Sequence, residues 1–151
     1  MSVKVKGLAQ ALKDIERKGE EAQKAVIAVL SDTATEIELD AENNAPYEIE
    51  GVVLNIKQRI DKIPTDGGLK WTVGIQGTKD FDAYVEFGTG QSARQILYGP
   101  GYTKEMREIA IQFKKKRDGV LIGSPFLFPA FIRHTANLVE EIKKEIAKNV
   151  K

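Results

Sequence analysis

The chain has 151 residues, of which 42% are hydrophobic and 30% are charged, and its formal net charge is +1. These values fit one globular domain with its own core, and they exclude a disordered chain or one that attracts nucleic acid by overall charge. The absence of cysteine excludes disulfides and thiolate metal sites. Because no stretch approaches the roughly 20 apolar residues of a membrane helix, no membrane segment is expected.

The first strong pattern is a long helix that begins at Glu20 and ends at the Asn43-Asn44-Ala45-Pro46 segment. Proline lacks the N–H that the next helical bond needs, and it disfavours helix in the residue before it. At 1.5 Å per residue this helix is about 38 Å long, a length that predicts a backing layer for a sheet. Small and apolar residues recur every three or four positions in one stripe: Ala22, Val26, Val29, Thr33, Ile37 and Ala41.

The next segment alternates apolar and polar residues, which predicts an antiparallel hairpin. We expect a strand over 51–63, a turn at 64–68 and a second strand over 69–75. The pair Asp66-Gly67 supplies the positive φ that hairpin turns require. One face of the hairpin is expected on the long helix and the other toward solvent or a partner.

Two shorter elements are predicted after the hairpin. Asp80–Phe87 suits a short helix that Gly88 ends, although its apolar residues would also suit a strand. Residues 91–122 are predicted to be an insert with a short helix of its own, which Thr103 can cap. A strand candidate over 120–122 closes this insert.

The last predicted element is a helix with Pro129 in its first turn, where the missing N–H costs nothing. Its predicted buried stripe is Ile132, Ala136, Val139, Ile142 and Ile146. All the elements together predict a single α+β domain over residues 1–151. In this fold a long N-terminal helix and a C-terminal helix pack on a small antiparallel sheet.

Two groups of side chains are candidate metal ligands. His134 is the only histidine, and because no HxxxH or ExxH spacing accompanies it, a structural role is favoured. Asp80, Asp82 and Glu86 have spacings that could hold Mg²⁺, but no phosphate-binding loop or general base accompanies them. A metal-dependent hydrolase is therefore the least favoured function, and we expect no enzyme activity, catalytic residue, metal or cofactor.

The segment Lys114-Lys115-Lys116-Arg117 is a basic run at the end of the predicted insert helix. Cations at a helix C-terminus interact favourably with its dipole, so a solvated helix end is the preferred interpretation. The alternative is a small nucleic-acid-binding module in which these four charges contact phosphates. No aromatic residues are interleaved with the run to stack on bases.

The segment Ser124-Pro125-Phe126-Leu127-Phe128-Pro129-Ala130-Phe131 holds the most unusual apolar cluster. Its aromatic residues can either fill the core under the sheet or form an exposed patch that packs on a neighbouring subunit. The sequence leaves both interpretations open.

Glu86 stands in an otherwise apolar setting between Val85 and Phe87. A partly buried carboxylate requires a hydrogen-bonding partner. The N–H groups of residues 88–90 or a basic side chain of a neighbouring subunit are the expected partners. An exposed glutamate fits the sequence equally well.

Three stretches in order, at 43–56, 84–89 and 125–130, resemble the phage family named for the HK97 gene-product-10 tail component. The first reads NNAPYEIEGVVLNI, the second YVEFGT and the third PFLFPA. The resemblance implies an α+β fold with a long helix on an antiparallel sheet. This chain departs from the family pattern in the long insert between the second and third stretches, which carries a predicted helix.

The resemblance also implies a structural role in a virion. Family members are tail-completion or neck proteins, in which a ring of subunits, expected to be a hexamer, joins the tail tube to the head connector. The implied partners are further copies of the chain, the tail tube protein, the head completion or connector protein, and passing contact with DNA in the channel. Assembly would take place in the cytoplasm of the bacterial host, and the final location would be the tail or neck.

The expected contact surfaces are the polar face of the hairpin, the loop over 91–102 and the insert helix. A ring of identical subunits needs a contact between two different surfaces, and loops that emerge from a rigid sheet can supply one. The candidate subunit or partner contacts are Glu86, Phe87, Gly88, Thr89, Gln91, Arg94, Tyr98, Tyr102, Phe126 and Phe128.

Overall fold

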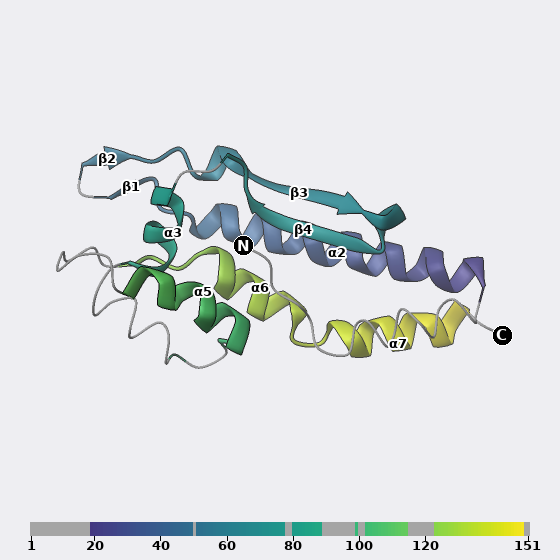
Figure 1. Cartoon of the computed structure of the whole chain (residues 1–151). Coiled ribbons are helices and arrows are strands. Elements are labelled where there is room, and N and C mark those ends of the chain that lie inside the picture. The colour runs from purple at the N-terminus through teal and green to yellow at the C-terminus, as the bar shows by residue number, and fades with distance from the viewer. Residues whose placement is uncertain are drawn as a thin grey trace.

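The computed structural model describes residues 19–49, 51–77, 80–88, 99, 102–114 and 123–149. Within these ranges the chain is an α+β protein, as predicted, in which a hairpin and a row of helices flank one long helix (Figure 1). Several predictions lie outside the described residues: the strand candidate at 120–122, most of the basic run, and the contact candidates Thr89, Gln91, Arg94 and Tyr98.

The long helix α2 spans Glu20–Asn44, which confirms its prediction from the apolar stripe. It ends where Ala45 takes an extended conformation, φ −63° and ψ 127°, as the residue before a proline prefers. The hairpin covers one side of α2 and the C-terminal helices cover another (Figure 1). Its buried residues are Ala22, Val26, Leu30, Thr33, Ala34, Ile37 and Ala41.

The predicted hairpin is confirmed as β3, Ile60–Thr65, paired antiparallel with β4, Lys70–Ile75. A short 3-10 turn, η2 (Asp66–Gly68), joins the strands, and Asp66 and Gly67 have positive φ values of 53° and 62°. Trp71 and Val73 lie on the face of the hairpin that packs against the buried residues of α2.

The prediction of one continuous strand over 51–63 is wrong. The chain instead forms a small ladder of β1, Glu48–Ile49, and β2, Val52–Val53, followed by a 3-10 turn, η1, over Lys57–Arg59. Asn55 has φ +50°, a left-handed conformation that asparagine tolerates and that interrupts a strand. Ile56 and Ile60 are both buried, and their spacing of four residues fits this turn as well as it fits strand alternation.

The two shorter helices occur where the sequence predicted them. α3 spans Asp80–Phe87, and α5 spans Lys104–Lys114 within the predicted insert. The Met106 N–H donates to the Thr103 hydroxyl oxygen at 3.3 Å, which confirms Thr103 as the cap of α5.

The prediction of one C-terminal helix needs correction, because the structure has two. α6 spans Leu127–Thr135 and α7 spans Leu138–Asn149. The Asn137 carbonyl accepts the first N–H groups of α7, from Glu140 and Glu141. The break moves the buried stripe, so that Leu138 enters the core with Ile142 and Ile146, whereas Ala136 lies exposed in the turn.

Candidate functional site

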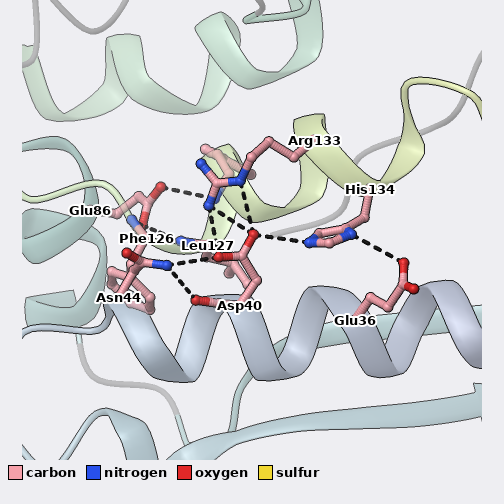
Figure 2. Close-up of polar contacts among 9 residues, drawn as sticks. Glu36, Asp40, Asn44, Glu86, Phe126, Leu127, Arg133 and His134 are labelled. Carbon is pink, nitrogen blue, oxygen red and sulfur yellow. Dashed lines mark hydrogen bonds and ion pairs between the residues drawn. The ribbon is translucent and has the colours of Figure 1, made fainter.

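The side chain of Glu86 is the most constrained polar group of the described structure. It comes from the last turn of α3, and the residue is only 1% exposed. Its two carboxylate oxygens accept the backbone N–H groups of Phe126, Leu127 and Phe128, each at 3.0 Å. Figure 2 shows the carboxylate facing this start of α6. The first N–H groups of a helix have no partner inside the helix and carry its positive dipole, so a carboxylate suits them.

Of the two alternatives left open by the sequence, the exposed Glu86 is therefore wrong, and the partly buried one is closer to the structure. Gly88 is the one residue of 88–90 that the structure describes, and its N–H is not a partner of Glu86. The Gly88 N–H donates instead to the Tyr84 carbonyl oxygen at 2.7 Å, which continues the α3 hydrogen-bond pattern. The requirement for a partner is met within the chain, by a segment that lies 40 residues further along. A contact of Glu86 with a neighbouring subunit remains a prediction.

Burial raises the pKa of the Glu86 carboxyl, while hydrogen bonds from the three backbone N–H groups act in the opposite direction. Burial and the nearby charge of Glu86 raise the pKa of Tyr102 to about 12. The phenol of Tyr102 therefore stays protonated at neutral pH. Both groups lie beside the start of α6, where Glu86 accepts three N–H groups and the Tyr102 ring meets that of Phe128.

Backbone contacts join the same two stretches a second time. The Ser124 N–H donates to the Val85 carbonyl oxygen at 2.8 Å. A Cβ atom at Gly123 would lie 2.5 Å from the carbonyl carbon of Phe87 and 2.6 Å from the nitrogen of Gly88. Only glycine allows this close approach of two backbones.

Aromatic packing completes the site. The rings of Phe87 and Phe128 have centroids 5.2 Å apart, and Tyr102 meets Phe128 edge to face at 6.4 Å. Phe126 belongs instead to a neighbouring cluster with Val85. Phe87 lies two residues before position 89 and Tyr102 directly after position 101, and both thus contact the same ring.

A second polar cluster fastens α6 to α2 (Figure 2). Asp40 accepts hydrogen bonds from the Arg133 guanidinium at 2.9 and 2.8 Å, and it lies 3.0 Å from Nε2 of His134. The other ring nitrogen of His134 lies 3.1 Å from Glu36. Burial acts to raise the pKa of Asp40, but hydrogen bonds and charge from Arg133 and His134 lower it overall. The structural role predicted for His134 agrees with these contacts.

Two acidic residues of α3, Asp82 and Glu86, do not converge on one point. Asp82 is buried and forms a two-point ion pair with the Arg59 guanidinium, at 2.7 and 2.5 Å, which holds α3 against η1. Glu86 meets α6 instead. Across the part of the chain that the structure describes, no three histidine or acidic side chains are placed to hold a metal ion.

Six of the predicted contact residues are described, and five are brought together: Glu86, Phe87, Tyr102, Phe126 and Phe128. Phe87, Phe126 and Phe128 are buried within the chain itself, in agreement with the core interpretation of the aromatic segment. Their contact with a neighbouring subunit remains a prediction. Gly123 was not predicted to belong to this site, although a Gly-Ser pair before a proline is a visible turn signal.

Comparison of the chain with protein-family models, with curated proteins and with solved structures gives no match. Among the helices over the described ranges, none is long and apolar enough to cross a membrane.

Proposed function

We propose that the chain is a structural component of a tailed-phage particle, a tail-completion or neck protein that assembles as a ring between the tail tube and the head connector. One observation carries the proposal: Glu86 and three N–H groups join the two stretches on which the resemblance is strongest. Motifs that lie 40 residues apart in the sequence form one site in the fold.

The construction of this site supports a role in positioning. The buried carboxylate, the close backbone approach at Gly123 and the aromatic stack hold the end of α3 against the start of α6. Gly88 and Tyr102, which flank the predicted loop, therefore both lie beside this joint. A loop with both ends anchored on a rigid core is suited to contact a neighbouring protein reproducibly.

In this proposal the protein acts by assembly alone, without catalysis or a cofactor. One surface of the ring binds the tail tube and stops further growth, and a second surface binds the head completion or connector protein. DNA passes through the central channel. The protein would be assembled in the bacterial cytoplasm and would remain in the tail or neck of the virion.

The proposal is tested by quantitative mass spectrometry of tailed particles purified from the strain that encodes the chain. The major capsid and tail tube proteins of the same particles serve as references for copy number. A small, fixed number of copies per particle is the expected result, because one ring contributes a fixed count. Absence from finished particles would contradict a place in the virion.

The alternative, a nucleic-acid-binding module, is proposed only for the basic run. Lys114 ends α5, and residues 115–117 lie outside the described ranges. A log–log slope of affinity against salt of about 0.9 per phosphate contact is the expected signature. Retention on DNA that does not change with salt, or that persists when all four cations are replaced by glutamine, would exclude this function.

A further inference from the structure

The two edges of the β3–β4 hairpin are not equivalent. The Gln76 N–H donates to the Arg59 carbonyl oxygen at 2.6 Å, which identifies that pair as hydrogen-bonded. Bonded and non-bonded pairs alternate along an antiparallel ladder. The pair of Lys62 and Val73 is therefore non-bonded, so the backbone groups of both residues point away from the hairpin.

The outer edge of β3 is blocked against further pairing. The Lys62 N–H, which points outward, donates to the carboxylate of the adjacent Asp61 at 2.8 Å. Pro64, the next residue with the same orientation, has no N–H to donate. Proline and charged side chains are the devices by which natural edge strands avoid pairing.

Among the described residues, the outer edge of β4 has no such protection. By the same alternation, the N–H and C=O groups of Trp71, Val73 and Ile75 point outward. Over the described residues, the only sheet partner of β4 is β3. The three side chains are only partly buried, so this edge offers both hydrogen bonds and apolar surface. An extended segment that pairs here would use both, as in strand addition.

A second open edge lies on the small hairpin near the end of α2 (Figure 1). The Leu54 N–H donates to the Tyr47 carbonyl oxygen at 3.0 Å, so Tyr47 and Leu54 form a hydrogen-bonded pair. The next pair, Glu48 and Val53, is therefore non-bonded, and the backbone N–H and C=O groups of both residues point away from the hairpin. The residue Val53 is 48% exposed. Within the part of the chain that the structure describes, this edge therefore presents an unpaired backbone and an apolar side chain.

We propose that β2 of one copy pairs antiparallel with the β4 edge of a second copy, with Val53 opposite Val73 of the next subunit. In a hydrogen-bonded pair both side chains lie on the same face, so Val53 would cover the partly buried apolar face of β4. The contact joins two different surfaces, which is the kind of contact that a ring of identical subunits requires. The net charge of +1 opposes such association only weakly. This interface deepens the proposed ring and rests on that function.

The native chain has no cysteine, so single introduced thiols report the contact directly. Val53→Cys protein, labelled with ¹⁵N, is mixed with unlabelled Val73→Cys protein under mild oxidation. Cα atoms of a hydrogen-bonded antiparallel pair lie about 5.5 Å apart, within the range of a disulfide. The mixed dimer should exceed, several-fold, the dimers that each variant forms alone.

The matched control replaces Val73→Cys by Ile63→Cys, an exposed position on the blocked strand β3. Equal cross-linking in the two mixtures would show random collision and would overturn the interface. No cross-link at any concentration would also overturn it. If a ring forms without the specific cross-link, the interface is refuted and the proposed ring is not.

Amide hydrogen exchange gives an independent measurement on the unmodified chain. When about nine tenths of the subunits are assembled, the Trp71, Val73 and Ile75 amides should exchange roughly tenfold more slowly than in the dilute protein. Thr72 and Gly74, whose amides lie in the β3–β4 ladder, are the internal reference. Full protection of the three edge amides in a dilute monomer would mean that the chain covers its own β4 edge, which would overturn the proposal.

Discussion

Replacement of Glu86 by glutamine tests whether its carboxylate organises the start of α6. The two oxygens of Glu86 accept three buried N–H groups, each at 3.0 Å. The single amide oxygen of a glutamine side chain can accept two of them, and its NH₂ group must lie beside the third. One buried donor without a partner costs about 1–3 kcal/mol. We therefore expect Glu86→Gln to lower the free energy of unfolding by that amount, and Tm by about 2–4 °C for each kcal/mol.

The assay is urea unfolding followed by circular dichroism, with thermal unfolding as a second measurement. The matched control is Glu140→Gln, which alters a solvent-exposed pair with Lys143 and should leave the free energy of unfolding close to that of the native protein. If Glu86→Gln is as stable as the control, the three hydrogen bonds do not hold α6 and the reasoning about this site is wrong.

The same variant has a signature in its pH dependence. Because the pKa of Glu86 is raised in the folded protein, the folded state holds a proton in a pH window where the unfolded state has lost it. The contribution of this ionisation to stability is thus fully present below the unfolded pKa and falls as pH rises through the folded pKa. The difference in unfolding free energy between native protein and Glu86→Gln should decrease across this window, and a difference independent of pH would contradict the raised pKa.

The packing of other residues gives three more predictions. Gly123→Ala should lower the free energy of unfolding by about 2 kcal/mol or more, because a Cβ atom would lie 2.5 Å from a backbone carbon. The control is Gly74→Ala, which has open space around it and should cost under about 1 kcal/mol in urea unfolding. A double-mutant cycle between Arg59→Met and Asp82→Asn should give a coupling of about 1–3 kcal/mol for this partly buried pair, and additive effects would show that the pair contributes nothing. Phe128→Ala should cost about 3–5 kcal/mol, measured by urea unfolding, and a loss below about 1 kcal/mol would place its ring outside the core.

Local sequence patterns predicted an element correctly wherever the residues of that element alone determine its structure. The stripe of α2 and the proline after it set both ends of that helix, and Asp66-Gly67 placed the turn of the β3–β4 hairpin. The short helix α3 and the cap at Thr103 follow from the same short-range rules. Periodicity, capping and turn chemistry act over a few residues, so a single sequence contains them.

The sequence predictions were wrong where one pattern of apolar residues fits two different structures. Ile56 and Ile60 fit strand alternation and also fit one helical turn, and the left-handed Asn55 decided in favour of the turn. In the last helix, the predicted apolar stripe held Ala136 and Val139 and left out Leu138. Packing against α2 determined that Leu138 is buried and that the helix breaks before it.

The sequence by itself determined the long helix, the main hairpin, the α+β class and the short motifs that carry the resemblance. Tertiary structure alone decided the role of Glu86, because its partners are backbone N–H groups of Phe126, Leu127 and Phe128. Every residue except proline carries such a group, so no residue type marks the partner of a buried carboxylate in the sequence. The open edge of β4 is likewise a property of strand pairing, which depends on register and on which neighbouring strands are present.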